Sequence, residues 1–257
     1  MVTYSLKKSY RLKDLKQKPF KDLWGLHGIF TTMWVFGKPV RILFFENHIK
    51  NMIKSLNVYG IKDINLKKKI IRIININLSK KKNYNHLLRV ALNKDLISIS
   101  LRRKISSKLD FNLKLINLKR EQPNHKNLKY RRILSHLKKI DNSKSDIGIV
   151  NKKRILETGT SNLVFIKNDK AFTPIKDYYV GNTYKYLKSK FKKIARKEIF
   201  VDDIKKFDEI LLFGSGKGVT SVKTINQIGW RRKGLKNYKI FLKYYQSAIK
   251  KSCLYRF

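Results

Sequence analysis

Four short segments of the sequence contain residue types that could together bind and activate one phosphorylated cofactor. Lys126 follows a turn around Pro123, and Glu157 precedes a run of small residues. Residues 181–183 open a predicted helix, and residues 214–218 form the glycine-rich loop GSGKG. Backbone N–H groups at a helix N-terminus and in a glycine-rich loop bind phosphate, while a lysine and a partner for a ring nitrogen are what pyridoxal 5'-phosphate requires. These segments therefore favour a pyridoxal-phosphate site.

Other catalytic motifs fail on spacing or on context. The loop at 214–218 lacks the GxxxxGK[ST] pattern, and a strand-like sequence follows it instead of a helix, which excludes a P-loop and a dinucleotide fingerprint. The five histidines show no HExxH or paired-ligand spacing, so we expect no metal site. The GxSxG elbow of many hydrolases does not occur in the sequence either.

The pattern of apolar residues predicts the elements that must position these segments. Alternating aromatic and β-branched residues on both sides of Gly37-Lys38-Pro39 predict a hairpin between Trp24 and Phe45. Helical spacing predicts a helix over Glu46–Tyr59 that ends at Gly60, and a second helix is expected over Ile61–Leu78. The segments Leu87–Leu92 and Leu96–Leu101, on either side of residues 93–95, predict a second hairpin, and Phe111–Leu118 is predicted as a further strand.

The second half of the sequence alternates predicted strands and helices. The helices are expected at Tyr130–Ile140, Thr183–Ala195, Asp202–Phe207 and Tyr238–Ile249. The strands are expected at Ile147–Val150, Leu163–Ile166, Glu209–Phe213 and Val219–Ile225. Glu121–His125, which contains Pro123, is the best candidate boundary. We therefore predict an α+β protein with a small N-terminal α/β domain at 1–120 and a larger mixed α/β domain at 121–257.

The chain is strongly basic, with 61 Lys and Arg against 17 Asp and Glu and a formal net charge of +44. A charge of this size is typical of proteins that bind nucleic acid or anionic membranes. Here the basic residues recur in nearly every predicted element, beside an excess of Ile, Asn, Tyr and Phe, all residues that A/T-rich codons encode. We interpret the charge as codon bias, and a basic nucleic-acid-binding module is the distant alternative.

Cysteine content and hydropathy indicate the compartment. The single cysteine, Cys253, forbids an intramolecular disulfide, so a reducing compartment is expected. The N-terminal residues contain no signal-peptide core, and no stretch of about 18 uninterrupted apolar residues occurs. We expect a complete, cytoplasmic chain that does not associate with membranes.

Six motifs in register resemble the class IV aminotransferase family, the pyridoxal-phosphate enzymes of fold type IV. That family includes branched-chain and D-amino-acid aminotransferases and aminodeoxychorismate lyase. The motifs are Gly28–Thr32, Phe44–Ile49, His125–Leu128, Glu157–Asn162 with Thr173-Pro174, Val180–Thr183 and Phe207–Ile210. The resemblance runs from about Gly28 to Ile225 and implies a homodimer that acts on a small amino substrate.

The resemblance also implies a role for each site residue. Lys126 would bind pyridoxal 5'-phosphate covalently and shuttle a proton, and Glu157 would keep the pyridine nitrogen protonated. Thr32 would be a second catalytic residue. The other implied cofactor-binding residues are Tyr130, beside the ring hydroxyl, then Asn162 and Gly216, and finally Asn182, Thr183 and Ser215 at the phosphate.

Two departures from the family pattern bear on affinity and substrate. Asn51 occupies the position where the family usually has an arginine that binds the phosphate. Phe30-Thr31-Thr32 and the short chain resemble aminodeoxychorismate lyase, which favours elimination of pyruvate to give 4-aminobenzoate. However, the glycine-rich RGxGxRGY loop of typical lyases is absent, and Ser100–Lys104 stands in its region. A transaminase of branched-chain or D-amino acids is therefore the alternative.

Overall fold

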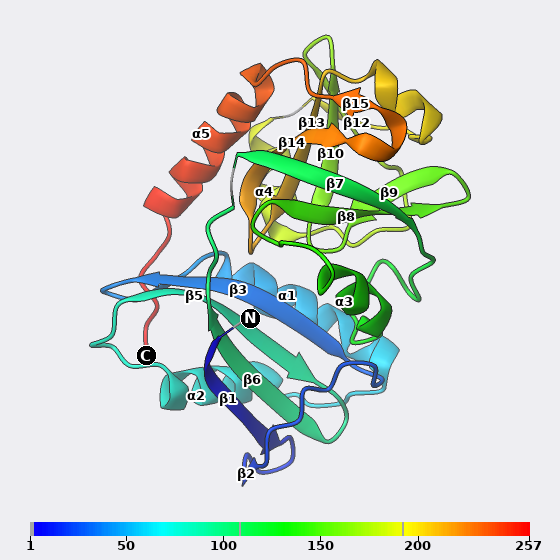
Figure 1. The fold of residues 1–257 in the computed structure, drawn as a ribbon. Coiled ribbons are helices and arrows are strands. Elements are labelled where there is room, and N and C mark those ends of the chain that lie inside the picture. Colours follow the sequence, from blue (N-terminus) through cyan, green and yellow to red (C-terminus); the bar gives the residue numbers. More distant parts are fainter. Residues whose placement is uncertain (1–2, 108, 192) are drawn as a thin grey trace. The chain divides into compact units, whose positions relative to one another are not determined.

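The chain forms two compact units in a computed structural model that describes residues 3–107, 109–191 and 193–257 (Figure 1). Unit 1 comprises Met1–Lys104, His125–Arg131 and Lys251–Phe257, and unit 2 comprises Ile105–Asn124 and Arg132–Lys250. The sequence-based division after residue 120 stays a prediction, because compactness alone does not show which segments fold independently.

Unit 1 is built on a six-stranded antiparallel sheet with the strand order β2-β1-β6-β5-β3-β4. The strands are β1 (Tyr4–Arg11), β2 (Gln17–Lys18), β3 (Ile29–Gly37), β4 (Arg41–Ile42), β5 (Tyr84–Leu92) and β6 (Leu96–Arg103). The helices are α1 (Phe45–Ser55), the 3₁₀ helix η1 (Asn57–Tyr59) and α2 (Leu66–Asn77). The two predicted hairpins are confirmed as β3 with β4 and β5 with β6. The predicted helix stop at Gly60 is confirmed as well, at a φ of 63°.

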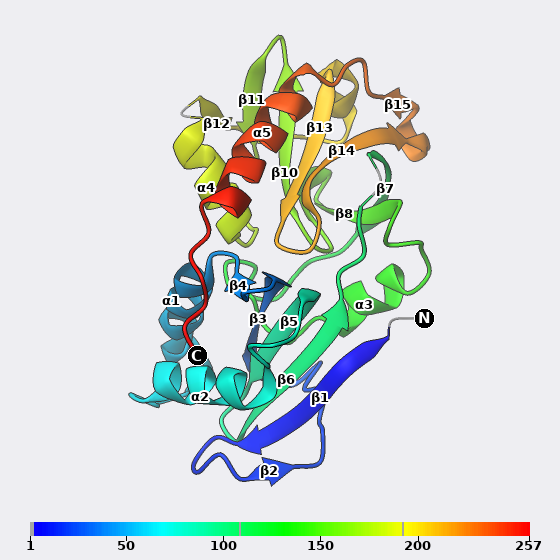
Figure 2. The ribbon, with the colours of Figure 1, turned by 90° about the vertical axis from the view of Figure 1, so that its left-hand side faces the viewer.

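The core of unit 1 lies between its sheet and its helices. Helices α1 and α2 cover one face of the sheet (Figure 2). Ile49 and Met52 of α1 and Ile73 of α2 are buried in the same apolar cluster as Met33 and Val35 of β3. Because successive strand residues point to opposite faces, this face takes the odd-numbered residues of β3, and Phe30, Thr32 and the other even-numbered residues lie on the opposite face. That second face carries the site residues of unit 1.

Unit 2 is built on a nine-stranded mixed sheet with the order β12-β11-β10-β13-β14-β7-β8-β9, and β15 pairs with β14. The strands are β7 (Asp110–Asn117), β8 (Ser145–Asn151), β9 (Arg154–Thr158), β10 (Asn162–Lys167), β11 (Lys170–Thr173), β12 (Ile194–Arg196), β13 (Glu209–Gly214), β14 (Gly218–Ile225) and β15 (Trp230–Arg231). The helices are α3 (Arg131–Leu137), α4 (Asn182–Lys190), α5 (Lys236–Lys250) and the 3₁₀ helices η2 (Asp202–Lys206) and η3 (Asn226–Ile228).

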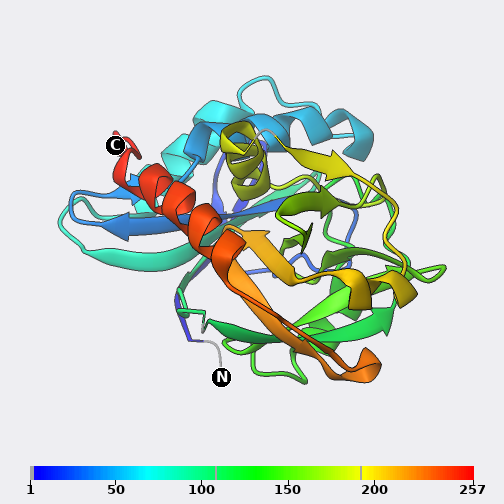
Figure 3. The ribbon, with the colours of Figure 1, turned by 90° about the horizontal axis from the view of Figure 1, so that it is seen from above.

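Helix α5 packs on strands β13 and β14 and beside α4 (Figure 3, α5 in red). Its N-terminus is fixed by the buried carboxylate of Glu209, which accepts hydrogen bonds from the backbone N–H groups of Asn237 at 2.8 Å and Tyr238 at 2.9 Å. A carboxylate at this end of a helix satisfies N–H groups that have no partner within the helix and opposes the positive end of the helix dipole. The family-like motif around Glu209 therefore has a structural role here.

The predicted α+β fold class is confirmed, but several predicted helices are too long. The helix expected over Glu46–Tyr59 is divided into α1, which ends at Ser55, and η1, and the helix expected over Tyr130–Ile140 ends at Leu137 as α3. The helix expected over Thr183–Ala195 ends at Lys190, and Ile194–Arg196 forms β12, which pairs in parallel with β11. Within the described part of the chain, no helix combines the length and hydropathy needed to cross a bilayer.

Candidate active site

Lys126 lies on a segment that extends the sheet of unit 1. The backbone N–H of Phe30 donates to the Lys126 carbonyl at 2.9 Å, and that of Leu128 donates to the Gly28 carbonyl at 2.9 Å. This pairing fixes the segment at the start of β3. The Lys126 Nζ atom lies 5.1 Å from the centre of the Phe30 ring. The amine is therefore held at the face of the sheet that carries Phe30.

Thr32 lies on this same face, because it follows Phe30 by two residues in β3. Its partner in register across the sheet is Arg89 of β5. Arg89 is a buried arginine that pairs with Asp22, donates to Ser100 Oγ at 3.3 Å and stacks 4.5 Å from the Trp24 ring. Its Nη1 atom is buried without a hydrogen-bond partner among the residues that the structure describes. The structure therefore places a cation with spare donor capacity next to Thr32.

Arg89 is a candidate functional residue that the motif comparison missed. It stands between apolar residues in the strand sequence LLRVAL. Arginine is almost never fully buried unless it is paired or bound, so a single arginine inside a buried strand was the available signal.

Tyr130 packs against two aromatic rings of unit 1. Its ring stacks on Trp24 with centroids 5.9 Å apart and meets Phe30 edge to face at 5.4 Å. Lys126 and Tyr130 therefore both contact Phe30, and their binding of one ligand stays a prediction.

His48 is a buried residue of α1, and its Nδ1 atom lies 2.7 Å from the Thr31 hydroxyl. Burial and the nearby charge of Lys126 lower the pKa of His48 to about 3. The imidazole is therefore neutral at physiological pH. Asn51, at the position of the usual phosphate arginine, lies one turn further along α1 with a partly exposed side chain.

Glu157 lies in unit 2 as the penultimate residue of β9, immediately before the run of small residues that follows it in the sequence. It is buried, and its carboxylate forms an ion pair with the guanidinium of Arg120, whose side chain is buried as well. The backbone N–H of Tyr179 lies 3.4 Å from the second carboxylate oxygen. The guanidinium favours the ionised form of Glu157, which is the form needed to bind a protonated ring nitrogen. Arg120 had no distinguishing sequence signal among so many basic residues.

Asn162 connects β10 to the segment that leads into α4. Its amide nitrogen donates to the Tyr179 carbonyl at 2.6 Å, and its amide oxygen accepts from the Gly181 N–H at 2.9 Å. A side chain at position 181 would crowd that oxygen, because an added Cβ would lie 2.9 Å from it. These contacts give Asn162 a role in shaping the approach to α4, and direct contact with a cofactor stays a prediction.

Asn182 and Thr183 are the first two residues of α4, and both are buried. The N-cap residue is Gly181, which has no side chain to occupy the first N–H groups of the helix. The Thr183 hydroxyl is buried without a hydrogen-bond partner in the part of the chain that the structure describes. A buried hydroxyl beside a helix N-terminus is suited to a phosphate, so these residues fit a phosphorylated cofactor.

Ser215 and Gly216 lie in the loop that joins β13 to β14. This loop is in close contact with the turn after Glu157, because a Cβ added at Gly214 would lie 2.6 Å from the Ser161 hydroxyl oxygen. The residues predicted for the ring nitrogen and the phosphate therefore all lie in unit 2. The other three predicted residues, Lys126, Thr32 and Tyr130, lie in unit 1.

Comparison with known proteins identifies the family and the fold of this chain. The model of the family "Amino-transferase class IV" matches residues 28–225. Among solved structures, a PLP-bound hypothetical aminotransferase from Mycobacterium tuberculosis has a TM-score of 0.72 at 15% identity, over 95% of this chain and 99% of that one. The branched-chain aminotransferase of Thermoproteus uzoniensis with norvaline has a TM-score of 0.75 at 13% identity, over 95% of each chain. A protein of Legionella pneumophila described as a candidate 4-amino-4-deoxychorismate lyase has a TM-score of 0.67 at 19% identity, over 85% of this chain and 91% of that one.

These likenesses define a pyridoxal-phosphate enzyme of the mixed α/β, fold-type-IV class. The chain belongs to the class IV aminotransferase family, since the family match covers most of its length. No match to the chain was found among curated protein sequences.

Proposed function

We propose that this enzyme is an aminodeoxychorismate lyase, which eliminates pyruvate from its substrate and leaves 4-aminobenzoate. The observation that carries the cofactor assignment is the buried Thr183 hydroxyl at the open N-terminus of α4. The resemblance of Phe30-Thr31-Thr32 to the lyases supports the reaction. A cytoplasmic location and a homodimeric assembly are part of the proposal. The homodimer would show twice the chain mass in sedimentation equilibrium.

Each residue has a defined task in this proposal. When bound, pyridoxal 5'-phosphate withdraws electrons from the substrate carbon that loses its proton. Lys126 would hold the cofactor through its Nζ amine, and the same amine could move a proton to and from that carbon. Glu157, which forms an ion pair with Arg120, would hold a proton on the pyridine nitrogen. Thr183 and Ser215 bind the phosphate with their hydroxyl groups and the neighbouring backbone N–H groups.

Arg89 and Thr32 bind the substrate in this proposal. The buried guanidinium has an unused donor at Nη1, and aminodeoxychorismate carries carboxylates that such a donor would bind. Thr32 lies opposite Arg89 in register and places its hydroxyl on the same face. The pair would thus orient the substrate, with Asp22 holding the guanidinium in place.

The second candidate is a transaminase of branched-chain or D-amino acids. It is favoured by Arg102-Arg103-Lys104, which stand where typical lyases have a glycine-rich loop. It is also favoured by the likeness to solved branched-chain aminotransferases, although likeness at this level of identity supports the fold alone.

The test separates the two reactions by their need for an acceptor. Purified enzyme is given aminodeoxychorismate without any 2-oxo acid, and pyruvate is measured. Release of pyruvate supports the lyase, whereas turnover that requires an added 2-oxo acid supports the transaminase. The variant Lys126→Ala should lose turnover and the visible absorbance of the bound cofactor. The variant Lys129→Ala, at an exposed lysine three residues away, is the matched control and should retain both.

A further inference from the structure

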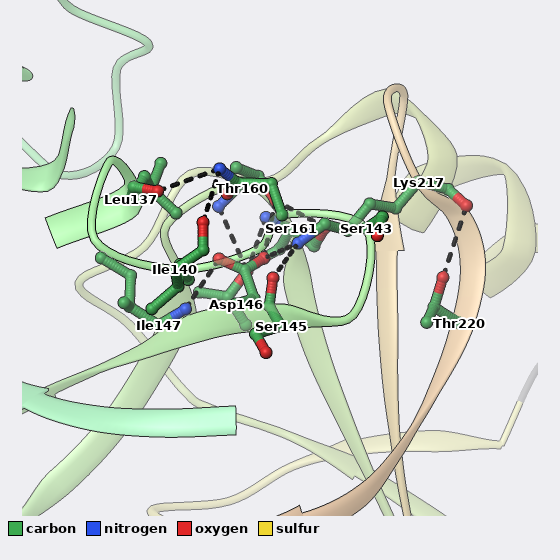
Figure 4. Close-up of polar contacts among 12 residues, drawn as sticks. Leu137, Ile140, Ser143, Ser145, Asp146, Ile147, Thr160, Ser161, Lys217 and Thr220 are labelled. Carbon is green, nitrogen blue, oxygen red and sulfur yellow. Dashed lines mark hydrogen bonds and ion pairs between the residues drawn. The ribbon is translucent and has the colours of Figure 1, made fainter. Parts of the chain in front are cut away.

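Asp146, on β8, is a completely buried carboxylate that two loops of unit 2 share (Figure 4). Its Oδ2 atom accepts hydrogen bonds from the hydroxyl groups of Thr158 at 2.8 Å and Thr160 at 2.6 Å. The same oxygen accepts from Lys217 Nζ at 2.6 Å. Its Oδ1 atom accepts from the N–H of Ile147 at 2.8 Å. A buried charge requires this kind of compensation.

Lys217 brings its charge to this carboxylate from the glycine-rich loop. Its side chain is only 8% exposed, and Nζ lies 4.5 Å from the centre of the Phe111 ring. Burial lowers the pKa of Lys217 below its usual value, and the neighbouring Asp146 opposes that shift. A loop lysine ordinarily extends into water, where its ammonium group is well hydrated. Here the side chain turns inward and ties its own loop to the sheet.

The second segment held by Asp146 is the turn at 158–161. Besides binding Asp146, the Thr158 hydroxyl accepts from the Ser161 N–H at 2.8 Å, and the Gly159 N–H donates to the Ile147 carbonyl at 2.9 Å. Glu157 and Asn162 flank this turn on either side. One carboxylate therefore fixes both the turn that bears the proposed ring-nitrogen partner and the loop that bears Ser215 and Gly216.

We propose that Asp146 and Lys217 are positioning residues that hold the loop 214–218 against the turn 158–161, and so set the affinity of the enzyme for the phosphate of its cofactor. This inference rests on the proposed function, in which Ser215 binds that phosphate. Lys217 does not itself touch the cofactor. Its effect is to fix the backbone of Ser215 and Gly216, so that the groups proposed to bind the phosphate are ordered before binding. Such preorganisation reduces the ordering that binding would otherwise require.

The test compares two ligands that differ only in the phosphate. The full chain, freed of cofactor, is titrated with pyridoxal 5'-phosphate and with pyridoxal, and binding is followed by absorbance. Lys217→Met keeps the side-chain length and removes the charge. It should weaken binding of pyridoxal 5'-phosphate at least about tenfold and that of pyridoxal no more than about twofold. Lys217→Arg, which can keep the ion pair, should restore most of the difference. A purely structural role would lower the unfolding temperature and leave the ratio of the two affinities unchanged.

A control and a second variant make the outcome decisive. Lys223→Met removes an exposed lysine of β14 that pairs with Asp110, and it should alter neither affinity. The double variant Asp146→Asn with Lys217→Met leaves no unpaired buried charge. It should therefore unfold at a higher temperature than Lys217→Met alone, yet keep the selective loss of affinity for pyridoxal 5'-phosphate.

Three outcomes would overturn the inference. Unchanged affinity in the variants, with normal binding by the original chain, would overturn this inference and leave the proposed function standing. Failure of both charge-removing variants to fold would make the pair a folding requirement, against the proposal. Failure of the original chain to bind pyridoxal 5'-phosphate at all would overturn the proposed function first, and this inference with it.

Discussion

Two buried polar clusters, one in each unit, contain titratable groups but differ in how these groups are paired. In unit 2, Asp146 and Lys217 form an ion pair across 2.6 Å. In unit 1, His48 is buried as a neutral ring beside the Thr31 hydroxyl, with its pKa lowered to about 3. Burial disfavours charge in both places. The difference is that Asp146 and Lys217 form an ion pair with each other, whereas His48 is buried as a neutral ring.

This difference predicts two kinds of sensitivity. A buried charge that loses its partner is left uncompensated, so a paired cluster should respond strongly to substitution. A buried neutral group has no such partner to lose, but its unfolded form takes up a proton in acid, so it should respond to pH. Substitutions in this chain can test separately the effect of burying a charged group and the effect of removing its partner.

The largest expected effect is at the second buried ion pair, Arg120 with Glu157, whose side chains are 5% and 6% exposed. Arg120→Met should lower the free energy of unfolding by about 3–5 kcal/mol, because it leaves the Glu157 charge buried without its cation. Urea denaturation measures the loss. The double variant Arg120→Met with Glu157→Gln should recover much of it. A double variant as unstable as the single one would show that packing of the arginine, and not its charge, provides the stabilisation.

A smaller effect is expected when a neutral donor to a buried charge is removed. Thr158→Val keeps the shape of the side chain and deletes the hydroxyl that donates to Asp146 at 2.8 Å. We expect a loss of about 1–3 kcal/mol in the same denaturation experiment. The comparison variant is Thr220→Val, since the Thr220 hydroxyl lies 3.4 Å from a neutral acceptor, the Lys217 carbonyl. Equal losses of unfolding free energy in the two variants would contradict the expectation that a donor to the buried Asp146 carboxylate stabilises the fold more than a donor to a neutral carbonyl.

The stability that the buried neutral ring of His48 contributes should depend on pH. Folded His48 stays unprotonated down to about pH 3, whereas an unfolded histidine takes up a proton below about 6.5. Between these values the unfolded chain binds more protons than the folded chain. The stabilising contribution of neutral His48 is therefore complete above about pH 6.5 and is lost as the pH falls toward 3. The slope is at most about 1.4 kcal/mol per pH unit.

The variant His48→Gln isolates this contribution, because an amide can still contact Thr31 but does not titrate in this range. Denaturation midpoints between pH 4 and 8 should fall less steeply on the acid side in the variant than in the original chain. The two chains should show parallel behaviour above about pH 7. An unchanged acid slope in the variant would mean that His48 does not titrate as a buried neutral group.

Local patterns in the sequence were enough to predict most of the elements around the site. The hairpin of β5 and β6 and the helix before Gly60 depend on neighbouring residues, and both were found. Ile194 and Ala195 of β12 were predicted as helix because Ile194 continues the helical spacing of Leu187 and Phe191. The segment forms a strand through pairing of Ile194 with Ala171 of β11, which lies far away in the sequence.

The site was predictable only where a motif marks it. Glu157 and Thr183 occupy motif positions, and the structure buries both. Arg120 and Lys217 are two among 61 basic residues, and no local feature shows that folding will bury them, whereas Arg89 stands alone in an apolar strand sequence. Burial depends on which strands come together, as when Arg89 lies opposite Thr32. The cations that folding buries were therefore the hardest to predict from the sequence.

The smallest effect is expected at an ion pair that has a partner but is not buried. Lys67 and Glu46 join α2 to α1 in unit 1 at 2.9 Å, with side chains 48% and 69% exposed. Lys67→Met should change the free energy of unfolding by only about 0–1 kcal/mol, because water already solvates both groups when the pair is broken. Measured beside Lys217→Met under the same conditions, it varies burial while keeping residue type, charge and pairing the same. If the two substitutions destabilised the protein equally, burial could not be the reason why Asp146 depends on its lysine, and the contrast with His48 would need another cause.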